Sequence, residues 1–379
     1  MSKHGKFEKQ PEKKSKGKKI LLTVITVLLV LVVGVGIAGT VVYNSFLNKI
    51  PRAEVVDNSL SDEEIQAMLN YNPDAPSDAT YTYTEPTEEE TTPTTLPYVE
   101  SGKDILNILV VGQAARDGEE QKMADTMILF TVNKETKTLT LTSFLRDAYV
   151  DLPDYKGHPC GYQRINVCYN LGHQWGGSGG AMEMTNMCLY NNFGIEVDYD
   201  IEVDFEAFIN IIDYLGGVEV ELTEAEAEYL NKDDLYVLED VEPGKVTLDG
   251  MATLSYARMR KANGDGDSDI KRTNRQRELV KILLRKIQSH SVSQAMDLIE
   301  CLLPKIVTNM TNEEITTCLW EILPILPQMT IETGTCPVET TYWGEIIELG
   351  GYPASVLKFD KGQNTRLMRA ITEGVEEGQ

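Results

Sequence analysis

The stretch ILNILVV at residues 105–111 decides the fold of this chain, because it is an apolar run with the length of a strand buried on both faces. TMILFTV at 126–132 and TLTLTS at 138–143 follow it, and the turn at 133–137 joins these two into a predicted β-hairpin. Further elements are expected in the order helix, strand, helix and strand, at residues 180–190, 201–203, 205–215 and 218–222. Strands that alternate with helices predict an α/β layer fold with an internal sheet.

Upstream of these strands, residues 20–43 form a run of 24 residues without a charged side chain. A helix of this length extends about 36 Å and can span the roughly 30 Å hydrocarbon core of a bilayer. Residues 1–19 carry eight lysines and two glutamates, and this excess of positive charge predicts a cytoplasmic N-terminus. We therefore expect a single-pass protein of the cell membrane whose bulk is extracellular. A cleaved signal peptide is the alternative, although the run is long for a signal core and no A-x-A site follows it.

Residues 44–103 are predicted to be an extracellular linker between this anchor and a folded domain at 104–379, with a C-terminal extension from about residue 300. The part at 74–103 is rich in Thr, Glu and Pro and is expected to form an extended stalk that lifts the domain from the membrane. A short helix is expected at 60–70, because Ser61 and Glu64 have the spacing of a capping box.

The charge balance excludes some partners. The chain carries 35 basic and 59 acidic side chains, and without the N-terminal tail the balance is 27 against 57. Such a negative surface argues against binding nucleic acid or anionic lipid through bulk charge, and it makes any local arginine cluster conspicuous. Six cysteines permit 15 disulfide pairings, among which the sequence does not choose. The absence of a CxxC motif and the presence of only four histidines argue against a structural zinc site.

Several arginines stand at the predicted ends of secondary-structure elements in this acidic chain. Arg146 follows the strand at 138–143, and a strong helix at 272–287 places Arg272, Arg275 and Gln276 on one face of its first turn. The N-terminus of a helix favours anions, and guanidinium groups bind phosphate through paired hydrogen bonds. These positions therefore point to a phosphate ligand.

Arg258 and Arg260 lie two residues apart in YARMR, residues 256–260. If this segment is extended, both side chains point to one face, whereas in a continuing helix they diverge by about 200°. Convergence of these two with Arg146, Arg272 and Arg275 would predict a pyrophosphate site. For any one arginine alone, an ion pair with a surface carboxylate is the more ordinary role, and both interpretations stay open.

Six segments occur in the order and at the spacing of a known family. They are ADTMILFTVN (124–133), LTSFLRDAYVDLP (141–153), RINVCYN (164–170), VDFEAFINIIDYLGGVEV (203–220), LDGMATLSYARMR (248–260) and KRTNRQRELV (271–280). With them, the chain over residues 105–287 resembles the LytR-CpsA-Psr (LCP) proteins of Gram-positive cell envelopes. The resemblance implies an α/β domain with a central mixed β-sheet flanked by helices on both faces, preceded by one transmembrane helix.

The resemblance also implies an extracytoplasmic phosphotransferase. Such an enzyme moves a glycopolymer (teichoic acid, capsule or another wall polysaccharide) from a polyprenyl-pyrophosphate carrier to peptidoglycan at the membrane. Asp125 would bind Mg²⁺ or Mn²⁺, Asp147 would orient an arginine, and Arg146, Arg258 and Arg260 would be catalytic together with Asp125. The residues expected to bind phosphate are Arg146, Arg164 (in the place of a family lysine), Arg258, Arg260, Arg272, Arg275 and Gln276.

Two positions depart from the family pattern. Ala114 stands where the family has a second metal-binding aspartate, and Met123 stands where it has an arginine. Mg²⁺ can still bind through one carboxylate and substrate phosphates, although its affinity without substrate should be weak. The departures leave two alternatives to the enzyme open. One is a weakened relative that binds the carrier or regulates envelope assembly, and the other is an unrelated exported adhesion or scaffold domain.

Overall fold

A computed structural model describes most of the chain. The described residues are 47–56, 58, 60–69, 104–113, 124–232, 241–259, 269–290, 294, 297–298 and 305–374. The chain divides into two units, Met1–Lys49 and Ile50–Gln379, and every element discussed below belongs to the second unit.

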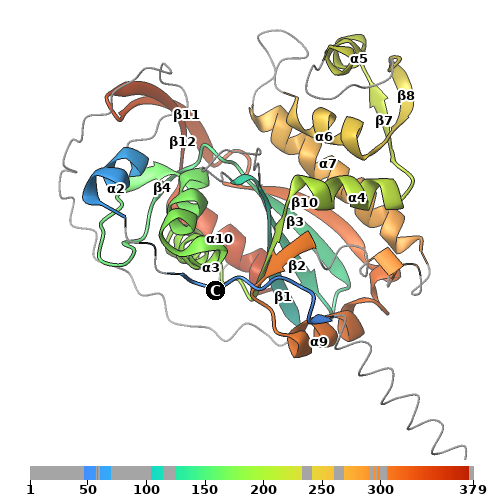
Figure 1. Cartoon of the computed structure of the whole chain (residues 1–379), viewed down its shortest axis with the longest axis horizontal. Helices are drawn as coiled ribbons and strands as arrows, with labels where there is room; N and C mark the ends of the chain where they lie inside the picture. The colour runs from blue at the N-terminus through green and yellow to red at the C-terminus, as the bar shows by residue number, and fades with distance from the viewer. Residues whose placement is uncertain are drawn as a thin grey trace, which may run out of the picture. The chain divides into compact units, whose positions relative to one another are not determined.

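The second unit is built on a six-stranded sheet with the strand order β10-β3-β2-β1-β6-β9 (Figure 1). β1 is antiparallel to β2 and parallel to β6, while β3 is antiparallel to β2 and parallel to β10, so the sheet is mixed as expected. Both edge strands come from the segment after residue 300, which is therefore an integral part of the sheet. The strands are β1 (Ile105–Gln113), β2 (Ala124–Asn133), β3 (Thr138–Phe144), β6 (Tyr199–Val203), β9 (Ile306–Thr308) and β10 (Thr330–Cys336).

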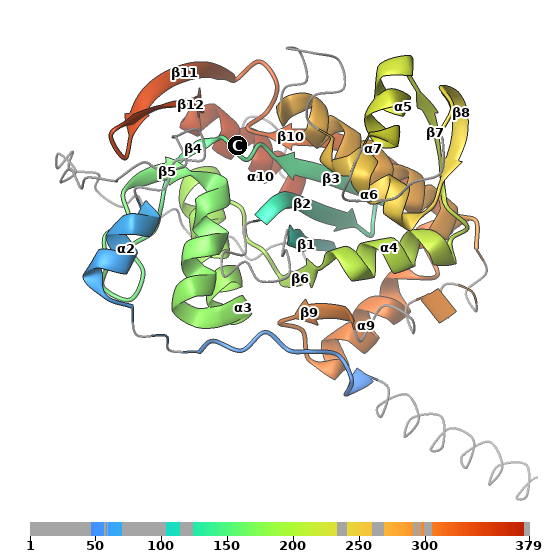
Figure 2. The same ribbon diagram turned by 45° about the horizontal axis from the view of Figure 1, so that its top comes forward.

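Helices cover both faces of this sheet (Figure 2). Met127 and Leu129 of β2 pack with α3 (Ile165–Phe193) and α10 (Lys361–Thr372) in one core. Ile128 of β2 packs with α7 (Asp269–Gln288) in another. Because side chains alternate along a strand, a continuous apolar run such as TMILFTV is what a strand covered on both faces requires.

The remaining elements surround this three-layer body. They are α2 (Asp62–Leu69), the hairpin of β4 (Tyr149–Asp151) and β5 (Tyr162–Arg164), α4 (Phe205–Tyr214), β7 (Val218–Leu222), α5 (Glu224–Asn231), β8 (Gly244–Leu248), α6 (Gly250–Arg258), α9 (Asn312–Ile322), η3 (Leu326–Gln328), β11 (Tyr342–Leu349) and β12 (Tyr352–Phe359). The strands and helices predicted between residues 105 and 287 are present with boundaries that differ by a few residues, except that the helix expected at 180–190 begins at Ile165.

α3 is folded back on itself, which the expected helix at 180–190 does not anticipate. The helix changes direction at Gly176 and Gly177, and Gly177 has a φ of 64°. A Cβ atom on Gly172 would lie 2.4 Å from the carbonyl oxygen of Gly180, so the two halves touch through their main chains. Two residues eight positions apart in a straight helix are separated by about 12 Å. The glycine-rich sequence at 176–180 therefore forms the turn of a tight helical hairpin.

Residues 51–58 pack across the domain and are called here the N-terminal strap. The Ala53 N–H donates to the carbonyl of Thr308 at 3.0 Å, which joins the strap to β9. The Val56 N–H then donates to the carbonyl of Gly176 at 3.0 Å, at the turn of α3. The strap thus connects the edge of the sheet to the helical hairpin.

α2 follows the strap and packs into the same core as α3 through Ile65, which is 2% exposed. Ser61 and Glu64 form the capping box expected from the sequence, because the Ser61 N–H donates to Glu64 Oε2 at 2.8 Å and the Glu64 N–H donates to Ser61 Oγ at 3.3 Å. Part of the segment assigned to the linker at 44–103 is therefore packed on the domain. The Thr/Glu/Pro-rich part at 74–103 lies outside the described residues.

Two further expectations touch regions that the structure describes only in part. None of the helices in the described residues is long and apolar enough to cross a membrane, and the predicted anchor at 20–43 lies outside them. The five described cysteines, Cys160, Cys168, Cys188, Cys318 and Cys336, are all free, while Cys301 lies outside the described residues.

Asp200 of β6 carries a buried carboxyl group whose protonation should affect stability. Its side chain is 0% exposed, and Oδ2 accepts hydrogen bonds from Asn186 Nδ2 and Asn309 Nδ2, both at 2.8 Å. Burial raises the pKa of Asp200 from 3.8 to about 6, although the two hydrogen bonds act in the opposite direction. A raised folded-state pKa stabilises the fold below about pH 4, and this stabilisation is lost as the pH rises to about 6.

An Asp200→Asn variant is therefore expected to be more stable than the wild type at pH 7.5, by about 2 kcal/mol. The difference should shrink as the pH falls towards 4.5, because the wild-type carboxyl then takes up its proton. Thermal unfolding at both pH values measures this, with Asp154→Asn, at an exposed position, as the control. A variant that is less stable than the wild type at pH 7.5 would show that the two asparagines require the charge.

Candidate active site

One edge of the central sheet collects the expected site residues. β1, β3 and β6 run in the same direction, so their carboxyl ends meet at one edge, next to the start of β2. Arg146 follows β3, Phe205 follows β6, and Asp125 is the second residue of β2. Ala114 and Met123, the two departures from the family pattern, lie outside the described residues.

Asp147 joins two of the expected arginines. Its Oδ1 atom lies 3.6 Å from Arg146 Nε and 3.7 Å from Arg164 Nε. Arg164 is 2% exposed, and its Nη2 donates to the carbonyl of Ser355 in β12 at 2.7 Å. The Asp147 carboxylate therefore orients the guanidinium groups of Arg146 and Arg164. The hairpin of β11 and β12 also fixes Arg164, through the Ser355 carbonyl. The sequence placed an orienting role on Asp147 but gave no sign of Ser355.

Arg258 is the last residue of α6, and its guanidinium lies 4.8 Å from the centre of the Phe205 ring. A cation over an aromatic face is attracted to it, so the Phe205 ring at the start of α4 contributes to fixing this side chain. Met259 is extended, with φ −52° and ψ 129°, and Arg260 lies outside the described residues. The question whether Arg258 and Arg260 share a face therefore stays a prediction.

The first turns of α7 are bonded to the end of α6. Arg275 Nη1 donates to the carbonyl of Met259 at 2.9 Å, and Gln276 Nε2 donates to that of Ala257 at 3.4 Å. Arg272, one turn earlier, is 3% exposed. The chain end of α6 and the start of α7 thus form one unit that carries Arg258, Arg272, Arg275 and Gln276.

Arg277 relates this unit to Arg146. Its Nη1 donates to the carbonyl of Gly334 in β10 at 2.9 Å, and Gly334 pairs with Thr142 near the end of β3. Arg146 stands four residues after Thr142. The structure therefore places the start of α7 and the Arg146–Asp147–Arg164 group at the same end of the sheet, as a site for one anionic ligand requires.

A buried polar chain lies beneath the ends of β1 and β6. Gln113 Nε2 donates to the Tyr169 hydroxyl at 3.0 Å, and this hydroxyl donates to Glu202 Oε2 at 2.5 Å. Burial and the neighbouring Glu202 carboxylate raise the pKa of Tyr169 well above its usual value, so the hydroxyl keeps its proton. The chain fixes the last residue of β1, directly before position 114. Only the tertiary fold brings these three residues together.

The donors for a divalent ion are few. Among the described residues, there is no cluster of three or more Asp, Glu, His or Cys side chains that could hold a metal ion. The main chain of Asp125 lies at the same edge of the sheet as the end of β3, while residue 114 lies outside the described residues.

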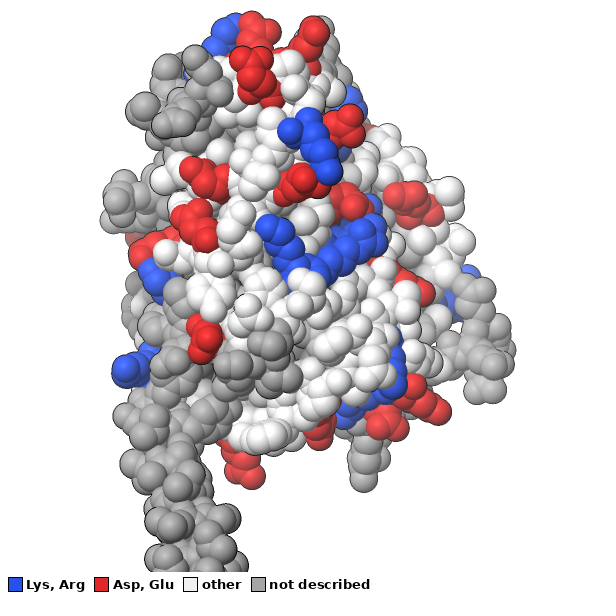
Figure 3. Space-filling model, turned by 90° about the vertical axis from the view of Figure 1, so that its right-hand side faces the viewer, with Lys and Arg blue, Asp and Glu red and all other residues white. Residues whose placement is uncertain are grey.

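The face of the domain that carries α4, α6 and β8 is mixed in charge (Figure 3). On this face, lysine and arginine side chains lie between aspartates and glutamates (Figure 3). A local set of arginines in such a surface favours a compact anion over an extended polyanion such as nucleic acid.

Comparisons with known proteins identify the family of the chain. A model of the LytR_cpsA_psr family matches residues 69–364. The polyisoprenyl-teichoic acid–peptidoglycan teichoic acid transferase TagU of Bacillus licheniformis is 31% identical over 220 residues, which are 58% of this chain and 63% of that protein. The corresponding transferase TagT of Bacillus subtilis is 34% identical over 200 residues, which are 52% of this chain and 57% of that protein.

A solved structure has a similar fold. The structure described as TagT bound to LIIa-WTA matches with a TM-score of 0.54 and 26% identity, over 72% of this chain and 92% of that chain. The chain belongs to the LytR_cpsA_psr family, because the family model covers most of its length. It spans somewhat less than two thirds of the length of the two transferases.

Proposed function

We propose that this protein is an extracytoplasmic phosphotransferase. It would move a wall glycopolymer, such as a teichoic acid or a capsular polysaccharide, from a polyprenyl-pyrophosphate carrier to peptidoglycan. The observation that supports this most is the shared use of Asp147 by Arg146 and Arg164, at the same end of the sheet as Arg258 and the start of α7. Membership of a family that includes proteins named teichoic acid transferases supports the choice of substrate.

The proposed reaction needs positioning and charge neutralisation more than covalent chemistry by the protein. A hydroxyl oxygen of peptidoglycan forms a bond to the phosphorus that carries the glycopolymer, and the bond from this phosphorus to the bridging oxygen breaks. The polyprenyl phosphate leaves with that oxygen, and the hydroxyl proton passes to solvent. Arg146, Arg164 and Arg258 would bind the oxygens on which negative charge grows, because guanidinium groups bind phosphate through paired hydrogen bonds.

We further propose that Asp125 and oxygens of the pyrophosphate together bind Mg²⁺, and that residues 20–43 anchor the protein in the cell membrane. One protein carboxylate with substrate phosphates is a normal way for this ion to bind. The ion would neutralise part of the pyrophosphate charge. No other step of the proposed reaction depends on it.

The test uses the full-length protein in vesicles, a polyprenyl-pyrophosphate-linked glycopolymer and a peptidoglycan acceptor. We expect transfer in the presence of Mg²⁺, and a decrease of at least about tenfold after chelation that added Mg²⁺ reverses. Full activity without a divalent ion would refute the metal proposal. Binding of the carrier without transfer would favour the weakened relative, and the double variant Ala114→Asp, Met123→Arg would then be expected to gain activity.

A further inference from the structure

The end of α6, which carries Arg258, is fixed through the next residue, Met259. The Met259 side chain is 0% exposed and packs in a cluster with Leu222, Leu230 and Leu248, from β7, α5 and β8. Its carbonyl accepts the hydrogen bond from Arg275. Met259 is therefore held on its side chain and on its main chain, in part by elements outside α6.

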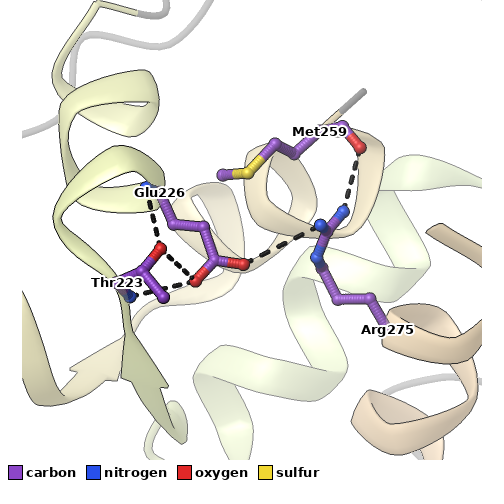
Figure 4. A network of polar contacts seen from close by, with 4 residues as sticks. All are labelled: Thr223, Glu226, Met259 and Arg275. Atoms are coloured by element: carbon purple, nitrogen blue, oxygen red, sulfur yellow. Dashed lines mark hydrogen bonds and ion pairs between the residues drawn. The ribbon is translucent and has the colours of Figure 1, made fainter. Parts of the chain in front are cut away.

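Arg275 in turn is held from two sides. Its Nη2 lies 3.8 Å from Glu226 Oε1, and its guanidinium lies 5.2 Å from the centre of the Tyr256 ring. The Arg275 and Glu226 side chains are only 7% and 12% exposed. An ion pair shielded from water in this way is stronger than one on the surface. Figure 4 shows that the guanidinium lies between the Glu226 carboxylate and the Met259 carbonyl.

Glu226 uses its second oxygen to cap α5. Oε2 accepts hydrogen bonds from the Thr223 N–H and from Thr223 Oγ1, both at 3.0 Å, and Oε1 faces Arg275. A capping box needs only one of these oxygens. The spacing of Thr223 and Glu226 is visible in the sequence, but the second contact depends on the position of α7 and is not.

We propose that Glu226 and Arg275 are positioning residues that hold the end of α6 and thereby set the direction of Arg258. In this assignment, which rests on the proposed function, Arg275 acts through the Met259 carbonyl and not as a ligand of phosphate. The small β7–α5–β8 unit thereby contributes to the site without contacting the substrate. The unit is linked to the end of α6 by three successive contacts: Thr223 with Glu226, Glu226 with Arg275, and Arg275 with the Met259 carbonyl.

The variant that tests this proposal is Glu226→Gln in the full-length protein. Its amide oxygen can still accept the capping hydrogen bonds, but the charge that holds Arg275 is lost. We expect kcat for transfer to fall at least tenfold while KM for the lipid-linked donor changes less than threefold. Arg275→Lys should behave similarly, and the double variant should be no worse than the worse single variant, because both changes break the same link.

The matched control is Glu314→Gln. Glu314 forms the same capping box with Thr311 at the start of α9, with hydrogen bonds of 2.7 Å from the Thr311 N–H and Oγ1. The same chemical change there should lower the thermal midpoint by a similar amount but leave kcat unchanged. Equal effects of Glu226→Gln and Glu314→Gln on kcat would overturn the proposal.

Hydrogen exchange of the main chain at residues 257–260 provides a readout that does not depend on transfer. Exchange should be faster in Glu226→Gln than in the wild type or in Glu314→Gln. Unchanged exchange would overturn the proposal, even if the proposed function holds. A wild-type protein that carries out no transfer would instead refute the proposed function, and exchange alone would then decide whether Glu226 fixes this segment.

Discussion

An Arg258→Ala variant is expected to fold normally and to lose transfer activity by about a hundredfold, the usual effect of removing one group that stabilises charge in a transition state. The fold should tolerate the change, because Arg258 is half-buried and its contact with the Phe205 ring contributes about 1 kcal/mol. Arg258→Lys should keep part of the activity, since it retains the charge but not the paired hydrogen bonds. Initial rates of transfer and the thermal midpoint of each variant measure the two effects separately.

The control for this prediction is Arg366→Ala on α10, which removes an exposed arginine that is not one of the expected site residues. It should leave transfer unchanged. If Arg258→Ala transferred glycopolymer at a rate within threefold of the wild type, Arg258 would not bind phosphate in the reaction. The proposed site would then have to rely on Arg146 and Arg164 alone.

A Gly172→Ala variant is expected to be markedly less stable than the wild type. The new Cβ would lie 2.4 Å from the Gly180 carbonyl oxygen and 2.8 Å from the Ala181 Cα, and these main-chain atoms cannot move without separating the halves of α3. Overpacking of a core typically costs about 1–3 kcal/mol, and we expect a value at or above the top of that range. Intrinsic helix propensity acts in the opposite direction, because alanine favours a helix over glycine by about 1 kcal/mol.

Thermal unfolding of the purified variants tests this. The matched control is Gly344→Ala in β11, where a Cβ would meet no atom within 4 Å. It should unfold at the temperature of the wild type. A Gly172→Ala protein as stable as the control would mean that the two halves of α3 are further apart than the structure shows.

The sequence predicted the central strands correctly because their signal is local. β1 and β2 are continuous apolar runs covered on both faces, and β3 follows across a short turn, so pattern and length were sufficient. The hairpin in α3 was missed for the opposite reason. The glycine-rich segment at 176–180 carries no local signal for a hairpin, and only the contact between Gly172 and Gly180 shows its role.

The site shows the same division. Arg146 and Asp147 could be chosen because they directly follow a predictable strand. Ser355, whose carbonyl accepts a hydrogen bond from Arg164, lies 191 residues after Arg164 in the sequence and could not be chosen. The sequence placed Arg272, Arg275 and Gln276 on one face of α7. It could not show which acceptors Arg275 would contact there. The hydrogen-bond and ion-pair partners of a long, flexible guanidinium depend on the neighbouring elements. For Arg275 these are the end of α6 and the start of α5.

The N-terminal strap and α2 precede the Thr/Glu/Pro-rich stretch at 74–103 and pack on the domain, so the domain begins before this stretch. Leu69 precedes this stretch and Ile105 follows it, and both residues belong to the same unit of the protein. The two ends of the stretch are therefore fixed in one domain. Doubling the length of a loop whose two ends are fixed costs only about 0.6 kcal/mol of chain entropy. A change in the length of the Thr/Glu/Pro-rich stretch should accordingly leave the contact between the N-terminal strap and β9 in place.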